Sequence, residues 1–362
     1  VSQSWGAGAE YLNTRLTQLN TSSDNCPSYG WGSPGACASL HPTQNDLPKT
    51  TGDQYAVWLH NTLGFAAGRF ELTPSLRYDA YQYSPSGYDA NPAANAFDFK
   101  NNSASAWSPK LLAQWNVTNS LSFSGQYALS FNAPTATQLY GLFQGFAGPS
   151  PYLIVGNPDL KPEKGHGWEL GANFENHAVS GSLTFFDNRY QHFINDVSQD
   201  TPGFLFVNTF ENLDRVRIYG IEASGTWHIT PRWRTFASLA WTVGKDQTTD
   251  RDLNTVAPLQ ALMGLGYFSE QWGASAQLVA SDRRSNISDE SQFIAPGYGV
   301  TNLTGYWRPA HLKGMTVQLG VFNLFDKSYW NPLDVPGSTP RAQIDRFTQP
   351  GRHVSLTLSY RY

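Results

Sequence analysis

Apolar and polar residues alternate along most of the chain, in runs of about ten residues separated by turn-forming segments. Successive side chains of a β-strand point to opposite faces, so each run predicts a strand with one apolar and one polar face. The final run is the clearest, with apolar residues at Val354, Leu356, Leu358, Tyr360 and Tyr362. Five upstream runs alternate in the same way: residues 70–79, 121–131, 221–229, 272–281 and 315–321.

The connections between these runs are short and long in turn. The short ones are Ala66–Gly68, Val117–Asn119, Asn176–Ala178, Thr230–Arg232, Ser269–Gln271 and Pro309–Gly314. The long ones are Leu16–Thr51, Ser84–Ser105, Asn132–Lys164, Lys245–Ala257, Asp282–Gly297 and Asn331–Pro350. Short turns at one end and long loops at the other are typical of outer-membrane barrels. The pattern therefore predicts an all-β fold, a transmembrane antiparallel β-barrel with about 14 strands in this chain. A soluble all-β protein is the alternative.

Composition favours the membrane barrel. Only 14% of the residues are charged, against about 25% in a soluble globular domain. Aromatic residues make up another 14%, and several fall at the ends of predicted strands, where membrane barrels place their aromatic girdles: Trp233, Trp241, Tyr306, Trp307, Tyr329 and Trp330. The chain has no apolar run near the roughly 18 residues that a transmembrane helix needs.

The cysteines and the net charge bear on the cell compartment and on the class of partner. The chain has two cysteines, Cys26 and Cys37, in one expected loop, and we predict a local disulfide because envelope proteins fold in an oxidising compartment. Two free thiols are the alternative. The net charge of −4 and the lack of a basic run argue against nucleic acid as a partner. The chain opens at Val1 without a leader, so we expect a processed protein or part of a longer one.

Several segments resemble the C-terminal barrel of TonB-dependent outer-membrane receptors. They are GNPDLKPE (Gly156–Glu163), WELGANFE (Trp168–Glu175), LTFFDNRY (Leu183–Tyr190), YGIEASG (Tyr219–Gly225) and GVFNLFDKSYW (Gly320–Trp330), with looser matches at Leu72–Tyr81 and Trp107–Trp115. This resemblance implies a barrel of 22 strands closed by an N-terminal plug. Residues 1–362 would then be the C-terminal part of that barrel, and the plug, the TonB box and the first strands would lie outside this sequence.

Two segments also resemble the paired FRAP and NPDL boxes of haem and haemoglobin receptors, a subgroup of that family. The matching positions are Phe131, Ala133, Pro134, Asn157, Pro158, Asp159 and Leu160, and the tail Asp345–Tyr362 is similar to the same group. The resemblance implies an outer-membrane receptor, monomeric and without an intrinsic cofactor. Its transported ligand would be haem, haem delivered by a haem protein, or a ferric chelate. Its other partners would be outer-membrane lipid and the TonB–ExbB–ExbD energy-transducing complex.

The chain departs from this subgroup at the expected iron ligand. Haem receptors commonly carry a histidine between the boxes, whereas residues 135–156 contain none, and Asn132 replaces the family's arginine. Tyr140 and Tyr152 lie in this interval, and a tyrosine phenolate can bind haem iron. A structural role is the alternative for Tyr140, and packing or solvent exposure is the alternative for Tyr152.

Further candidates lie on other long connections. His41 and His192 are candidate haem contacts, with hydrogen-bonded or solvated histidines as the alternative. Arg283 and Arg284 are candidates for bidentate bonds to propionates, with a solvated pair as the alternative. The sequence lacks HExxH, GxSxG and convergent carboxylates, so we predict no resident metal and no enzyme activity.

Two other functions remain open on the sequence. A ferric-siderophore receptor of the same fold is the first, favoured by the missing histidine. A passive porin-like channel, closed by these strands alone, is the second.

Overall fold

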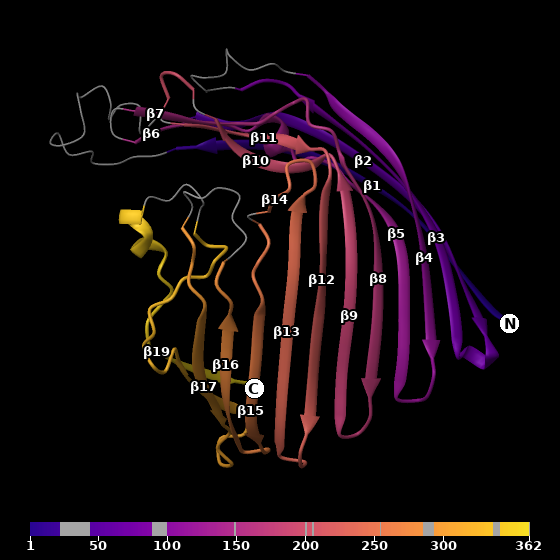
Figure 1. Ribbon diagram of the computed structural model, residues 1–362, viewed down its shortest axis with the longest axis vertical. Coiled ribbons are helices and arrows are strands. Elements are labelled where there is room, and N and C mark those ends of the chain that lie inside the picture. Colours follow the sequence, from indigo (N-terminus) through magenta and orange to yellow (C-terminus); the bar gives the residue numbers. More distant parts are fainter. Residues whose placement is uncertain are drawn as a thin grey trace.

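The computed structural model describes residues 1–21, 44–88, 100–147, 150–199, 201–204, 206–253, 255–284, 293–335 and 341–361. Within them a 15-stranded antiparallel sheet forms a tall curved wall (Figure 1). Fourteen of its strands follow one another in the order β1-β2-β3-β4-β5-β8-β9-β12-β13-β15-β16-β17-β18-β19, and β14 pairs only with β13. The predicted transmembrane-type antiparallel wall of about 14 strands is confirmed.

The wall strands are β1 (Ser2–Asn20), β2 (Gln44–Phe65), β3 (Phe70–Pro85), β4 (Asn102–Asn116), β5 (Leu121–Asn132), β8 (Glu163–Glu175), β9 (Val179–Gln191), β12 (Val216–His228), β13 (Trp233–Asp246), β14 (Arg251–Asp252), β15 (Gln260–Phe268), β16 (Trp272–Ser281), β17 (Tyr298–Trp307), β18 (Met315–Phe322) and β19 (His353–Tyr360). A short helix, η1 (Ala66–Gly68), turns the chain from β2 into β3, and η3 (Arg341–Phe347) precedes β19.

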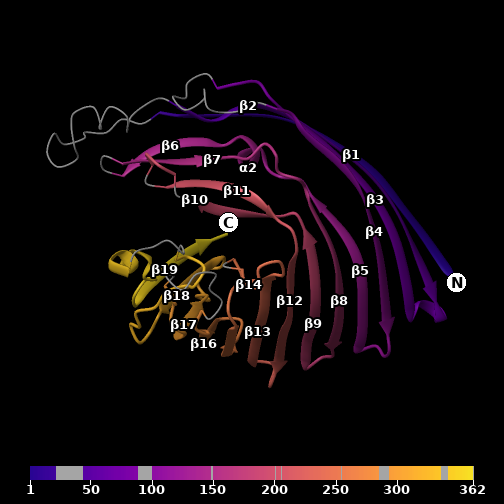
Figure 2. The same ribbon diagram turned by 45° about the horizontal axis from the view of Figure 1, so that its top comes forward.

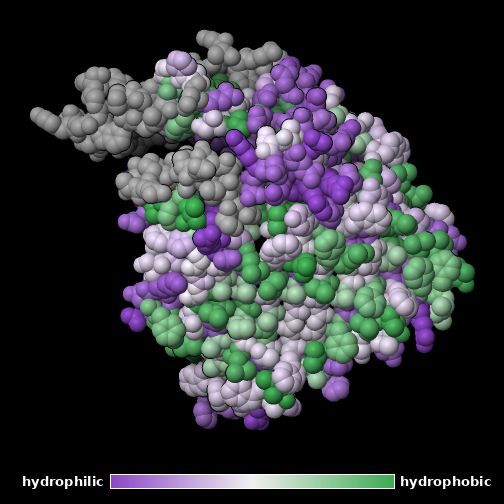
Figure 3. Space-filling model, in the orientation of Figure 1, coloured by the Kyte–Doolittle hydropathy of each residue, from purple (hydrophilic) through white to green (hydrophobic). Residues whose placement is uncertain are grey.

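The register brings the apolar positions of neighbouring strands onto one face. Ile221 of β12, for example, is paired with Phe185 of β9 on one side and with Trp241 of β13 on the other. Large apolar side chains on this face are open, with Leu170 54% and Leu319 52% exposed. Figure 3 shows hydrophobic residues spread across it. A soluble protein rarely exposes so wide an apolar surface, whereas a barrel presents it to lipid.

The opposite face is polar, and its side chains bond across strands. Gln126 Nε2 donates to Glu169 Oε2 at 2.9 Å, and the hydroxyls of Ser182 and Ser224 lie 2.8 Å apart. The register places Glu222 on this same face. Polar groups facing a wet interior keep their solvation, so this face corresponds to the predicted barrel lumen.

Three of the six predicted girdle residues lie on the lipid face. Trp233 and Trp241 stand at the two ends of the apolar stretch of β13, and Trp307 ends β17. Tyr306 instead faces the lumen by alternation, and the Trp330 indole donates to the Ile344 carbonyl at 3.1 Å in a loop. The girdle prediction is wrong for Tyr306 because a position near a strand end does not fix the face, and wrong for Trp330 because this residue lies outside the strands of the wall.

The short connections are tight turns closed by local hydrogen bonds. At Asn176, the side-chain oxygen accepts from the amides of Ala178 and Val179 at 2.8 Å. In η1 the residues Ala66 and Ala67 take positive φ values of 50° and 57°, followed by Gly68 at 83°. Asx turns and left-handed residues reverse the chain in few residues, which confirms the predicted short-turn end.

A second sheet lies beyond the other end of the wall. Its order is β10-β11-β7-β6, from β6 (Leu142–Ala147), β7 (Ser150–Val155), β10 (Phe193–Gln199) and β11 (Val207–Leu213). We call it the loop sheet. It is preceded by the helix α2 (Ala136–Tyr140). Figures 1 and 2 show the loop sheet running across the end of the wall where the long connections lie.

The predicted extents of the long connections are wrong at several places. Leu16–Thr51 was expected to be loop, yet β1 continues to Asn20 and β2 begins at Gln44. Asn132–Lys164 contains α2, β6 and β7, and the β10–β11 hairpin was not predicted at all. Beyond the membrane neither face of a strand contacts lipid, so the apolar alternation that marks strands in the wall is lost.

The wall is open in the described part of the chain, where β1 and β19 are its two edges. The prediction of a channel closed by these strands alone is therefore not supported. An open wall agrees instead with a portion of a larger barrel. Separately, none of the described helices is long and apolar enough to cross a bilayer.

Candidate functional site

The first box (Phe131–Pro134) ends β5 and leads into a capped helical turn, α2. The second box is Asn157–Leu160. Thr135 and Gln138 make a capping box: the Thr135 hydroxyl accepts from the Gln138 amide at 3.2 Å, and Gln138 Oε1 accepts from the Thr135 amide at 2.8 Å. This reciprocal bonding satisfies amides that a helix start leaves open. Thr135, directly after Pro134, is thus the N-cap of α2.

Tyr140, at the end of α2, is completely buried. Its exposure is 0%, as is that of Leu139, and both pack with Leu160 of the second box and with Tyr81 and Tyr83 of β3. The Tyr140 hydroxyl donates to the Lys100 carbonyl at 2.9 Å. Burial raises the pKa of Tyr140 to about 12, which disfavours the phenolate that would bind iron. In this conformation Tyr140 anchors α2 to the wall.

Asn157 joins the second box to both of its neighbours. Its backbone amide donates to the Gln138 carbonyl in α2 at 2.8 Å. Its Nδ2 donates to the Phe210 carbonyl in β11 at 2.9 Å, and its Oδ1 accepts from the Asp159 amide at 2.9 Å. The last bond closes an Asx turn across Pro158. One asparagine thus connects the first box, the second box and the loop sheet.

Two further asparagines complete this arrangement. Asn102 of β4 donates from Nδ2 to the carbonyls of Pro158 and Leu160, at 3.1 and 3.0 Å. Asn212 of β11 accepts from the Lys161 amide at 2.8 Å and donates to the carbonyls of Lys161 and His192, at 3.0 and 2.7 Å.

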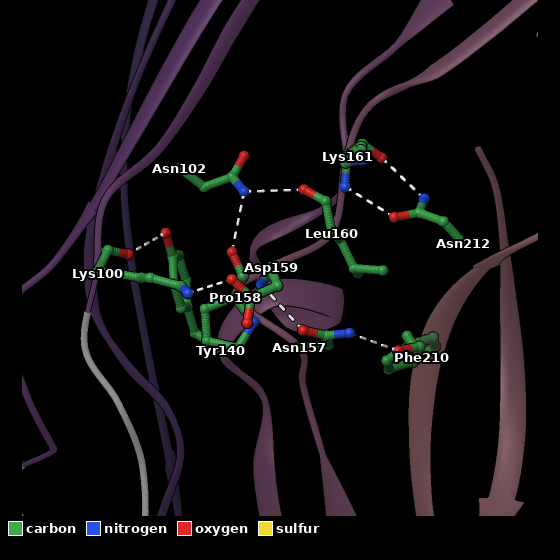
Figure 4. Close-up of polar contacts among 10 residues, drawn as sticks. All are labelled: Lys100, Asn102, Tyr140, Asn157, Pro158, Asp159, Leu160, Lys161, Phe210 and Asn212. Carbon is green, nitrogen blue, oxygen red and sulfur yellow. Dashed lines mark hydrogen bonds and ion pairs between the residues drawn. The ribbon is translucent and has the colours of Figure 1, made fainter. Parts of the chain in front are cut away.

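We call Asn102, Tyr140, Asn157–Leu160 and Asn212 the box junction; Figure 4 shows their contacts, including the ion pair of Lys100 with Asp159. Asn102 and Asn212 were not candidates from the sequence. An asparagine that bonds to a distant backbone has no distinguishing pattern in a single sequence.

The box junction holds the loop sheet at the outer end of the wall. β7 follows the first box and comes before the second, whereas β10 and β11 lie in the long connection between β9 and β12. The two connections pair directly, because β11 runs parallel to β7 with Val207 opposite Leu153. The Leu153 amide also donates to the Phe206 carbonyl at 3.1 Å.

Tyr152 lies in an aromatic cluster on the loop sheet. Its ring stacks on Phe206 with centroids 5.0 Å apart, and Phe143 lies 5.9 Å away. Gly145 is opposite Tyr152 in the register, and a Cβ there would lie 2.4 Å from the tyrosine Cζ. Tyr152 is only partly buried. The cluster therefore combines two phenylalanine rings with one phenol.

A pocket of about 360 Å³ opens on the lumen face below the first box. Ala133 and Pro134 line it from the box, and Tyr81 and Tyr83 line it from β3. Arg77 of β3 also lines this pocket.

The Arg77 guanidinium bonds to Asp79 at 2.8 Å, reaches Glu10 at 3.6 Å, and lies 5.1 Å from the Trp58 ring centroid. Arg77 was not singled out from the sequence, although its lumen-facing position follows from the alternation of β3.

The structure places the remaining candidates separately. His192 is partly buried with a positive φ of 57°, and its carbonyl is bound by Asn212. Arg283 is exposed. Arg284 is only 4% exposed, and its Nη1 donates to the Pro332 carbonyl at 2.9 Å, so the solvated interpretation is wrong for it. Burial lowers the pKa of Arg284.

His41, Cys26 and Cys37 lie outside the described residues. Among the residues that are described, no group of three or more His, Cys, Asp and Glu side chains is placed to hold a metal ion.

Comparisons with known proteins agree on the fold. A family model described as TonB dependent receptor-like, beta-barrel matches residues 2–324. The hemin receptor of Yersinia pestis is 26% identical over 322 residues, covering 84% of this chain and 43% of that protein. The hemoglobin-haptoglobin utilization protein B of Neisseria meningitidis serogroup C is 25% identical over 299 residues, covering 68% and 36%.

A solved structure, the copper transporter OprC, superposes with a TM-score of 0.77 at 21% identity, covering 99% of this chain and 54% of the other. At that identity the likeness concerns the fold alone. The chain spans less than half the length of the two curated relatives.

Proposed function

Because this chain belongs to the TonB-dependent receptor-like β-barrel family, we propose that it is the C-terminal wall and outer-loop portion of an outer-membrane receptor that takes up haem, free or delivered by a haem protein. The lipid-facing band of the wall supports placement in the outer membrane. The ligand passes through unchanged, and the driving force comes from the TonB–ExbB–ExbD complex, acting through a part of the receptor outside this sequence.

The observation that carries this proposal is the box junction. Two segments that resemble the paired boxes of haem receptors are brought together at the outer end of the wall by the bond from the Asn157 amide to the Gln138 carbonyl. A relative named as a hemin receptor is similar across 84% of this chain, which favours haem over other cargoes of the fold.

Within the site we assign the iron-binding role to Tyr152. Its ring is only partly buried and stacks with Phe206, so a planar porphyrin can lie against the same aromatic cluster. Tyr140 is less suited because it is buried and its hydroxyl is bound to Lys100. His192 and His41 are secondary candidates for the second axial position, and Arg283 is the exposed cation available to a propionate.

Arg77 and its pocket fit a later stage of uptake. The pocket lies on the lumen face directly under Ala133 and Pro134, so a ligand leaving the outer site would pass it. Tyr81 and Tyr83 offer aromatic contacts to a ligand there, while the Arg77 guanidinium is already paired with Asp79 and Glu10.

A haem titration of the full-length receptor, purified in detergent, tests the proposal. We expect a saturable, shifted Soret band. Tyr152→Phe should weaken and shift that band, whereas the matched variant Tyr140→Phe should leave its position unchanged. A ferric siderophore that quenches the tryptophan fluorescence, with no Soret shift on adding haem, would replace haem with the siderophore alternative.

A further inference from the structure

A row of cations lies on the lipid face where apolar residues are expected. Cross-strand pairing places His166 of β8 opposite Arg189 of β9, and Arg189 opposite Arg217 of β12. Lys164 is two residues from His166 and so lies on the same face. We call Lys164, His166, Arg189 and Arg217 the outer basic row.

The outer basic row begins directly beyond the aromatic edge of the lipid-facing band. His166 is two residues from Trp168, and Arg217 is two residues from Tyr219. Trp168 is 57% exposed on the same face as Leu170. Aromatic rings of this kind mark the depth of lipid headgroups, so the cations stand at the level of those headgroups or just outside it. Figure 3 shows hydrophilic residues gathered above the hydrophobic band on this face.

The arrangement is unfavourable for the isolated sheet. Like charges directly opposite each other destabilise a pair of strands, and Arg189 and Arg217 are so placed. Asp187 offsets this only in part: it binds Arg217 through two bonds of 2.6 and 3.1 Å, whereas Arg189 is 3.7 Å away and remains 56% exposed. Three permanent cations face one carboxylate, which leaves an excess of two positive charges.

The excess positive charge is confined to β8, β9 and β12. The next strand continues the row with Lys245, paired with Arg217, but Lys245 has its own carboxylates in Asp250 at 3.3 Å and Asp252 opposite it. On the other side, His166 is next to Leu129 of β5.

We propose that the outer basic row binds the phosphate groups of lipid headgroups in the outer leaflet. Guanidinium groups form bidentate bonds with phosphate oxygens, and Lys164 and His166 supply further donors. The neighbouring Trp168 and Leu170 contact the acyl region of the same lipid. This inference depends on the barrel lying in an outer membrane and not on haem as the cargo.

Native mass spectrometry of the full-length receptor tests this proposal. The protein in uncharged detergent is titrated with diphosphorylated lipid A, and with phosphatidylcholine as the zwitterionic comparison. We expect selective retention of lipid A, weakened tenfold or more in the double variant Arg189→Gln, Arg217→Gln. Arg15→Gln removes a cation from the same face of β1 and should change nothing. Asp187→Asn should strengthen binding because it frees both arginines.

Equal retention by the wild type and the double variant, with unchanged unfolding temperatures, would overturn the proposal. So would displacement of the lipid by inorganic phosphate at equal concentration, since that would indicate a simple anion site. Preferential binding of an acidic peptide over lipid A would assign the row to a protein partner. If the double variant does not fold, the Asp187→Asn result alone decides, because a row without a lipid ligand gives no gain.

Discussion

The side chain of Asn157 donates a hydrogen bond to the carbonyl oxygen of Phe210 across 2.9 Å, although the two residues belong to different long connections. This bond ties the second box to the loop sheet. The box residues that resemble those of haem receptors therefore act here as connectors between segments at the outer end of the wall.

Replacing Asn157 should loosen the loop sheet and leave the wall intact. Asn157→Ala removes the bonds to Phe210 and Asp159 and leaves a carbonyl unpaired, a loss of about 1–3 kcal/mol. We expect faster hydrogen exchange at β10 and β11 amides. Asn195→Ala is the control, since within the described ranges its side chain bonds to the neighbouring Asp196 carbonyl and to no other residue. Equal exchange in both variants would contradict the connecting role.

The buried Tyr140 phenol should make the receptor sensitive to alkali. Its pKa is about 12 in the folded protein against 10 in the unfolded chain, so unfolding is favoured once the unfolded chain loses the proton. The contribution is therefore constant below about pH 10 and is lost between about pH 10 and 12. Urea unfolding of the wild type and Tyr140→Phe at several pH values measures it. A stability difference that stays constant up to pH 12 would rule this out.

A methyl group at Gly145 should displace Tyr152. The added Cβ would lie 2.4 Å from the ring, so the ring must leave its stack on Phe206. We expect Gly145→Ala to weaken haem binding, by the Soret titration, without changing the unfolding of the wall. Gly225→Ala is the matched control, because its Cβ would meet the Ser180 carbonyl at an ordinary 3.5 Å. Unchanged haem affinity in Gly145→Ala would separate Tyr152 from the ligand.

A charge introduced on the lipid face should lower the free energy of unfolding far more than a charge introduced on the lumen face. Leu170→Arg puts a cation into the apolar band, which costs about 2–4 kcal/mol near its middle. Thr184→Arg faces the lumen opposite Glu222 and should be nearly neutral. Urea titrations of the full-length receptor in lipid vesicles measure both. A similar cost for the two variants would mean that the two faces are wrongly assigned.

The wall was predictable from the sequence because its strands alternate apolar and polar side chains, one kind on each face. Leu170 and Ile221 lie on the apolar face while Glu169 and Glu222 lie on the polar face, so the period of two is kept within the apolar band of the wall. For Tyr140 the sequence left two alternatives, iron binding and a structural role, and its complete burial favours the structural role. Tyr152 remains a prediction for iron binding.

The box junction was not predictable in the same way. Asn102 and Asn212 act through bonds to backbone atoms 20 to 58 residues away, and no periodicity marks such partners. The burial of Arg284 depends on the Pro332 carbonyl, 48 residues later in the chain. Contacts of this range are set by how the long connections fold over one another, which a local pattern does not contain.

The parallel pairing of β7 with β11 has a consequence for how tightly a ligand is held. Separate long loops would each lose conformational entropy when they close on a ligand, which weakens binding. Here Val207 and Leu153 pair directly, so backbone pairing within the chain itself holds the two connections to each other. A haem that meets Tyr152 would then find a preorganised surface, and most of its contact free energy would appear as affinity.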